Sequence, residues 1–151
     1  MKILNKNKKK KGFTLIELVA VVAIIGILAA LLVPKIAGYI TDAKKTKVID
    51  QARKVVMAVE TANTKEDVTL PVGTTITQLF ASNASGTIKV AQQYLDPATE
   101  GKDKVVPNLP DATSFANCKA ITEGKEFEID NNGILSKIEN TAIGGGSGDQ
   151  E

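Results

Sequence analysis

The sequence predicts an α+β fold, in which one long N-terminal helix packs against a small antiparallel β-sheet of three or four strands. Three observations lead to this prediction. An apolar run extends from Phe13 to Val33, apolar residues then recur at helical spacing over residues 42–62, and short alternating segments separated by glycine turns follow near the C-terminus. A helix followed by a sheet is the element order of an α+β domain.

The chain begins with a basic leader, residues 1–12, which holds six lysines and no acidic residue. Without this leader the chain has 13 basic and 17 acidic residues, so its positive net charge belongs to the leader alone. Lysines ahead of an apolar helix indicate that this end stays in the cytoplasm. No later basic stripe carries interleaved aromatic residues, so nucleic-acid binding is not indicated.

The apolar run of residues 13–33 is long enough to cross a bilayer, since about 20 residues are needed. Its one charged residue is Glu17. A carboxylate inside a membrane costs free energy, which makes it a functional candidate that needs a partner. Cleavage between Gly12 and Phe13 creates such a partner, because the new α-amino group of Phe13 can pair with Glu17 of a shifted neighbouring copy. The alternative is an acid tolerated near a helix end.

Residues 12–17, Gly-Phe-Thr-Leu-Ile-Glu, stand behind a lysine-rich leader and ahead of an unbroken apolar helix. This pattern resembles the class III signal of type IV pilins and pseudopilins, over about residues 8–40. The resemblance implies that a prepilin peptidase cuts between Gly12 and Phe13 and methylates Phe13. It also implies that Glu17 guides the subunit into a helical filament, built by an inner-membrane assembly platform. Pro34 matches the proline usual at the end of the buried segment.

The long helix is expected to run from Phe13 to about Asn63, with residues 13–33 as transmembrane segment and filament core and residues 34–63 as an amphipathic half. Pro34 removes a backbone hydrogen bond and is expected to kink the helix, and Gly26 is a second weak point. By the family resemblance, the stretch between these two residues can lose helicity in a filament. One predicted stripe faces the core: Val48, Ala52, Val55, Val56, Val59 and Ala62.

A globular head over residues 64–143 is expected to cover this stripe. Residues 75–84 have apolar residues at helical spacing and a threonine that can cap a helix. Residues 87–95 predict a short helix, with a strand left open as the alternative, and residues 96–111 predict a loop. The glycine-rich residues 144–151 predict a flexible tail.

The predicted strands are residues 114–122, 126–130 and 134–139, since turns containing glycine separate them and apolar residues alternate with acids. One of these turns, Asp130-Asn131-Asn132-Gly133, resembles part of a calcium loop. A plain β-turn is the stronger interpretation, because no glutamate closes a loop at the expected distance.

The composition gives no support to an enzyme. The chain has no histidine and one cysteine, Cys118, which excludes a histidine triad, a histidine metal ligand and a thiolate zinc cluster. No cofactor or metal is expected. Cys118 is expected to be a small buried residue, with a reactive thiol as the alternative. Many Gram-negative pilins carry a C-terminal cysteine pair, so a single cysteine fits a Gram-positive pilin or a pseudopilin better.

These observations predict a structural subunit of a type IV pilus that serves adhesion or motility. The subunit is expected to sit in the cell membrane as a single-pass protein, surrounded by lipid, and to move into a surface pilus. One alternative is a major pseudopilin of a type II secretion or DNA-uptake system. The other is an uncleaved, single-pass membrane-anchored binding module that never polymerises.

Overall fold

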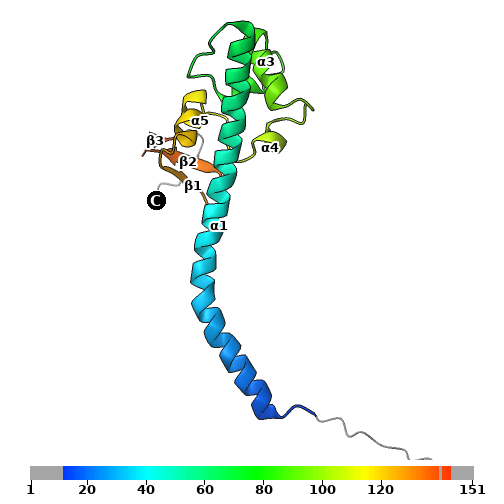
Figure 1. The fold of residues 1–151 in the computed structure, drawn as a ribbon, viewed down its shortest axis with the longest axis vertical. Helices are drawn as coiled ribbons and strands as arrows, with labels where there is room; N and C mark the ends of the chain where they lie inside the picture. The colour runs from blue at the N-terminus through cyan, green and yellow to red at the C-terminus, as the bar shows by residue number, and fades with distance from the viewer. Residues whose placement is uncertain (1–11, 140, 144–151) are drawn as a thin grey trace, which may run out of the picture. The chain divides into compact units, whose positions relative to one another are not determined.

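The computed structural model describes residues 12–139 and 141–143, which fall into two units, residues 12–39 and residues 40–143 (Figure 1). The predicted leader, except Gly12, and the predicted tail of residues 144–151 lie outside the described residues.

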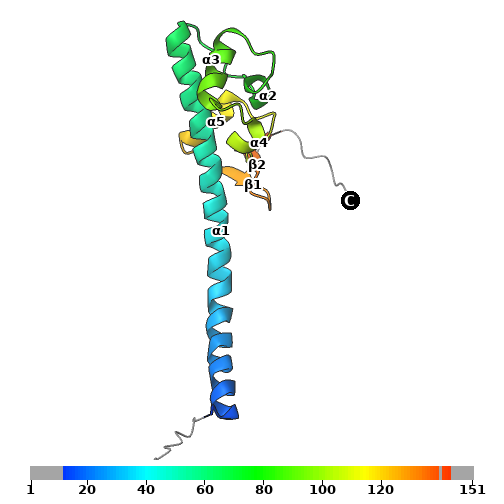
Figure 2. The same cartoon turned by 90° about the vertical axis from the view of Figure 1, so that its right-hand side faces the viewer.

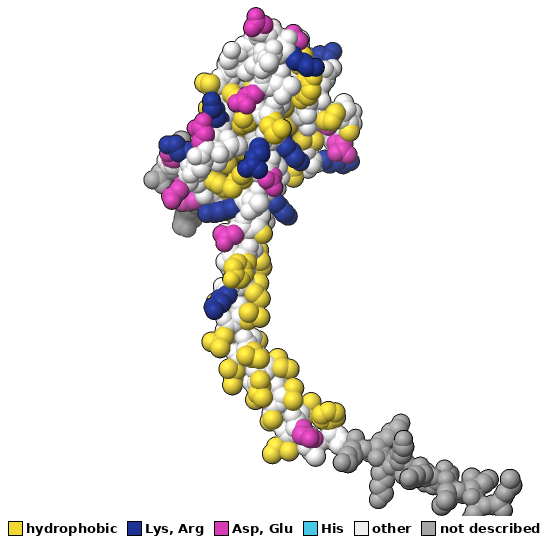
Figure 3. All heavy atoms as spheres, in the orientation of Figure 1, with side chains coloured by type: hydrophobic (Ala, Val, Ile, Leu, Met, Phe, Trp, Pro, Cys, Tyr) yellow, Lys and Arg dark blue, Asp and Glu magenta, His cyan; other side chains and the backbone are white. Residues whose placement is uncertain are grey.

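The long helix α1 extends from Leu15 to Glu66 and contributes to both units. It begins two residues later and ends three residues later than predicted, and it continues through Gly26 and Pro34 without ending. In the first unit its apolar side chains are exposed, as the space-filling view shows in yellow (Figure 3). The kink expected at Pro34 stays a prediction.

The second half of α1 buries one face, and all six residues of the predicted stripe lie on it. Residues spaced three and four apart share one side of a helix, which is why the pattern could be recognised. Gln51 and Ala58 extend the buried face. No described residue before Val48 is buried, so the core of the second unit begins there.

Short helices and a small sheet pack along this face (Figures 1 and 2). The helices are α2 (Ile76–Leu79), α3 (Gly86–Leu95), α4 (Lys102–Val105) and α5 (Phe115–Thr122). Their buried apolar residues form one cluster with the stripe of α1, and the main contributors are Ile76, Leu79, Ala91, Leu95, Phe115, Cys118 and Ile121.

Local capping explains where two of these helices begin. The Thr75 hydroxyl accepts a hydrogen bond from the Gln78 backbone N–H, and the Gln78 side chain accepts one from the Thr75 N–H. Ser114 and Asn117 make the same reciprocal pair ahead of α5. Each capping box satisfies two backbone donors that a helix start leaves unpaired. The predicted cap at Thr75 is confirmed.

Three local predictions need correction. Residues 114–122 are not a strand but helix α5, because the Ser114 cap starts a helix whose apolar residues then recur three apart and are buried. The predicted loop of residues 96–111 contains the short helix α4. The helix expected over residues 75–84 is the single turn α2. Residues 87–95, left open between helix and strand, lie in helix α3.

The sheet contains three antiparallel strands in the order β1-β2-β3: Phe127–Ile129, Leu135–Ile138 and Thr141–Ala142. The strand count of three or four and the hairpin between β1 and β2 are therefore confirmed, although the third strand is not the segment predicted. In the connecting turn, one Asp130 carboxylate oxygen accepts hydrogen bonds from the N–H groups of Asn132 and Ile134, both at 2.8 Å. Gly133 adopts φ +84°, which favours glycine.

A polar network joins α1 to this turn. The Gln51 side chain donates to the Asn108 side-chain oxygen at 2.7 Å and accepts from the Asn108 N–H at 2.8 Å. Asn108 in turn donates to the Gly133 carbonyl at 2.9 Å, and the Leu135 N–H donates to the Asn108 carbonyl at 3.0 Å. Each polar group in this half-buried set has a partner, so the network fixes the sheet against the helix.

Candidate functional site

The candidate site is the start of α1, where a backbone cap holds the one carboxylate of the apolar run. Glu17 Oε2 accepts hydrogen bonds from the Thr14 N–H and from Thr14 Oγ1, both at 2.8 Å. Thr14 Oγ1 accepts the Glu17 N–H at 3.3 Å. This is a capping box, because a threonine is followed three residues later by a glutamate and both side chains bond the other's backbone.

Sequence reasoning treated Glu17 only as a charge in need of an external partner, and it overlooked Thr14. The signal was present, since Thr14-Leu15-Ile16-Glu17 has the spacing of a capping box ahead of an apolar run. In the single subunit the carboxylate is therefore hydrogen-bonded within its own first turn. A group satisfied in this way is less costly to hold in an apolar environment than a bare one.

The Gly12–Phe13 peptide bond lies just ahead of α1, outside any helix, and both residues are exposed. Phe13 has 89% of its surface exposed. Gly26 and Pro34 lie further along the same helix, within the first unit. The structure thus brings Glu17 together with Thr14 and leaves the expected scissile bond in an open segment.

The surface of the first unit is apolar and bare. Exposed large hydrophobic residues follow one another from Phe13 to Ile36. Among the described elements, α1 is the one helix that is long and apolar enough to cross a membrane by length and composition. A patch of this size exceeds what a protein surface in water normally carries, so it marks a contact with lipid or with other protein.

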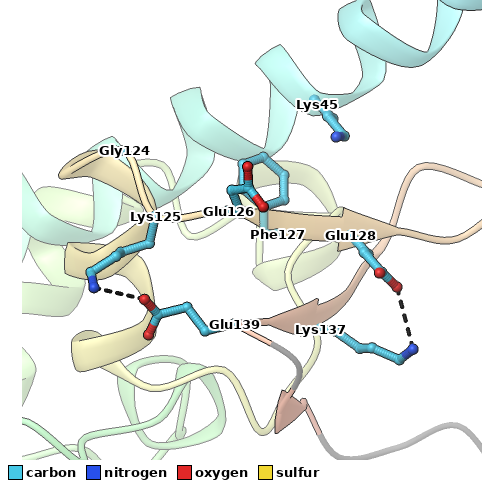
Figure 4. Close-up of a pocket in the computed structure, with 8 residues that line it drawn as sticks. All are labelled: Lys45, Gly124, Lys125, Glu126, Phe127, Glu128, Lys137 and Glu139. Atoms are coloured by element: carbon cyan, nitrogen blue, oxygen red, sulfur yellow. Dashed lines mark hydrogen bonds and ion pairs between the residues drawn. The ribbon is translucent and has the colours of Figure 1, made fainter.

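A charged hollow of about 630 Å³ beside β1 is a second place where ionisable groups gather (Figure 4). Four of its six charged residues form ion pairs: Lys125 with Glu139 at 2.6 Å, and Lys137 with Glu128 at 3.3 Å. The hydrogen bond from Lys125 to Glu139 raises the pKa of that lysine. The other two charged residues are Glu126 and Lys45, and the Lys45 ammonium group lies 5.8 Å from the centre of the Phe127 ring. This hollow holds no nucleophile beside a base, which nucleophilic catalysis needs.

Cys118 is fully buried in the core, as expected. Burial raises the pKa of its thiol to about 12, so almost no reactive thiolate forms at neutral pH. Within residues 12–139 and 141–143, no group of three or more histidine, cysteine, aspartate or glutamate side chains is placed to hold a metal ion.

Known proteins resemble the chain in the same region and beyond. Residues 7–33 match the family model described as the prokaryotic N-terminal methylation motif. The type IV major fimbrial protein FimA of Dichelobacter nodosus is 34% identical over 126 residues, which span 78% of this chain and 80% of that relative. The type IV major alpha-pilin of Moraxella bovis is 35% identical over 105 residues, with 52% of this chain and 66% of the relative covered.

A fimbrial protein of Pseudomonas aeruginosa is 46% identical over 55 residues, which span 36% of each chain. No solved structure is a significant match. Nothing in these relatives supports the Gram-positive source that the single cysteine suggested. Four observations point to the same family. They are the methylation motif, the exposed apolar helix, the α+β unit and the match along most of a major fimbrial protein. The chain belongs to the type IV pilin family.

Proposed function

We propose that this chain is the main structural subunit of a type IV pilus. A prepilin peptidase cuts between Gly12 and Phe13 and methylates the new N-terminus of Phe13. The subunit then waits in the cell membrane as a single-pass protein, and the assembly platform moves it into a surface filament used for adhesion or motility. The observation that carries this proposal is the exposed apolar surface of α1 with its single carboxylate, Glu17, one turn from the proposed new end.

The exposed apolar surface of α1 determines which interactions can select its register in a filament. Moving α1 from lipid into a bundle of identical helices exchanges one apolar environment for another, so burial alone selects no register. The Phe13 amine of a neighbouring copy supplies the missing selection, because an ammonium group can pair with the Glu17 carboxylate. Before assembly, Thr14 occupies that carboxylate, and the pairing replaces or adds to its two hydrogen bonds.

The N-terminus of the native protein tests this proposal. Mass spectrometry of the membrane-extracted and sheared-filament fractions is expected to find chains that begin at methylated Phe13. A mature chain that still begins at Met1 and stays in the membrane supports the uncleaved anchored module instead.

The names of the relatives, major fimbrial protein and pilin, favour a pilus over a pseudopilin. Electron microscopy of the cell surface separates these two, because only a pilin forms long external fibres.

A further inference from the structure

A partly apolar groove lies on the side of the second unit where α3 and α4 meet α1. This α3–α4 groove has a volume of about 480 Å³ and is lined mainly by α1, the C-terminal end of α3, the loop after it and α4. Met57 of α1 and Tyr94 of α3 are 62% and 44% exposed there. An exposed methionine beside an exposed aromatic ring offers an adaptable contact surface.

The rim of the α3–α4 groove carries two lysines, Lys54 and Lys104, which form no ion pair within the part of the chain that the structure describes. Asp96 also lines the groove, but its two carboxylate oxygens already accept the N–H groups of Glu100 and Gly101 at 2.8 and 2.7 Å. Glu100 is the only other acid among the lining residues. The groove therefore favours a partner that combines apolar side chains with carboxylates.

One segment of the same unit has this composition. The Glu66–Val72 segment begins at the last residue of α1 and carries Glu66, Asp67, Val68 and Val72, and the two valines are 53% and 66% exposed. Its backbone is held in place, since the Leu70 N–H donates to the Asn63 side chain at 2.9 Å and the Val72 carbonyl accepts the Ala116 N–H at 2.9 Å. Little conformational entropy is lost when a segment fixed in this way binds a partner.

The segment begins near the groove, since the Lys65 ammonium group lies 5.0 Å from the centre of the Tyr94 ring, but its Val72 end is held against α5, so one subunit does not place that end in its own groove. Val72 is bonded to α5, whereas α3 and α4 stand on the other side of α1 in Figure 1. A contact between two different surfaces of identical subunits is heterologous, and it propagates into an open filament when its rotation does not close a ring. We infer that the α3–α4 groove of one subunit receives the Glu66–Val72 segment of the next subunit. This inference rests on the proposed function.

Cysteine cross-linking in native filaments tests the contact directly. The double variant Met57→Cys/Val72→Cys is expected to form a ladder of disulfide-linked oligomers when intact filaments are oxidised. Each single variant is expected to give no ladder, because Cys118 is buried. The matched control is Met57→Cys/Glu123→Cys, which places the second cysteine on an exposed residue outside the segment. A ladder from the control, or none from the first pair, overturns the contact.

Charge exchange provides a second test. Lys54→Glu/Lys104→Glu is expected to lower the yield of sheared filaments about ten-fold, because like charges then face each other across the contact. Glu66→Lys/Asp67→Lys is expected to do the same, and the four changes combined are expected to restore the yield. Equal yields in all variants, or no recovery in the combined variant, overturn the contact while processed wild-type filaments keep the proposed function intact. If the wild-type chain forms no filament at all, both proposals fail.

Discussion

At the scale of the residue, Glu17 has two possible partners that act at different times. Its own Thr14 holds it in the subunit, and the proposed Phe13 amine of a neighbour holds it in the filament. We predict that Glu17→Gln leaves membrane insertion unchanged and lowers filament yield about ten-fold, because the neutral amide loses the charge-assisted pairing. Asp42→Asn, which removes an exposed acid later in α1, is the control. Immunoblots of membrane and sheared fractions measure both effects, and a normal yield for Glu17→Gln contradicts the role.

A second residue-scale prediction concerns the expected scissile bond. Gly12→Ala is expected to be processed, whereas Gly12→Leu is expected to accumulate as the uncut chain, because a bulky side chain beside the bond obstructs the peptidase. Mass spectrometry of the membrane fraction distinguishes the two forms by the mass of the leader. Equal cleavage of both variants would show that the peptidase does not depend on a small residue at this position.

Cys118 predicts a pH effect on stability. Burial raises the pKa of its thiol to about 12 from an ordinary value of 9.0, so the folded chain keeps a proton that the unfolded chain releases. Stability is therefore expected to fall as pH rises from about 9 towards 12, since the folded state then binds more protons. Cys118→Ala is expected to remove this part of the slope. Urea midpoints of the full chain in detergent micelles, measured at several pH values, compare the two proteins, and parallel slopes contradict the expectation.

At the scale of the element, the polar network of Gln51 and Asn108 connects α1 to the β-turn. We predict that Asn108→Ala lowers the free energy of unfolding by about 1–3 kcal/mol, because it leaves half-buried partners unpaired. Gln51→Ala/Asn108→Ala is expected to cost less than the sum of the single changes, as residues in one network do not act additively. Urea denaturation of the four proteins closes this cycle, and strict additivity would show that the two side chains are not coupled.

Some of these elements could be predicted from the sequence and others could not. The stripe of α1 was predictable because one buried face imposes a period on many successive residues. Helix α5 was mistaken for a strand, although Ser114 followed by Asn117 is a capping pattern, because eight residues give too few turns to establish a period. Strand β3 has two residues and is defined by its pairing with β2, so the sequence shows no alternating pattern that would predict it. The cap between Thr14 and Glu17 could be predicted from its spacing, but the charge of Glu17 suggested a partner in a neighbouring copy instead.

At the scale of the whole molecule, the two units differ in whether they bury a core of their own. The core of the second unit is assembled from residues 48–138, and none of its buried residues comes from the first unit. We predict that a fragment of residues 40–151 is soluble without detergent and unfolds in one cooperative transition, while the full chain requires detergent. Size-exclusion chromatography and urea denaturation measure this, and an aggregated or non-cooperative fragment contradicts it.

The absence of any buried described residue before Val48 has a consequence for how such a subunit can change over generations. A substitution in the second unit affects the packing of its own core or surface, whereas a substitution in the apolar first unit affects only its contacts with lipid or with other proteins. In the proposed filament, exposed positions of the second unit can therefore change from one relative to the next while the apolar surface of the first unit, which packs against other copies, stays the same.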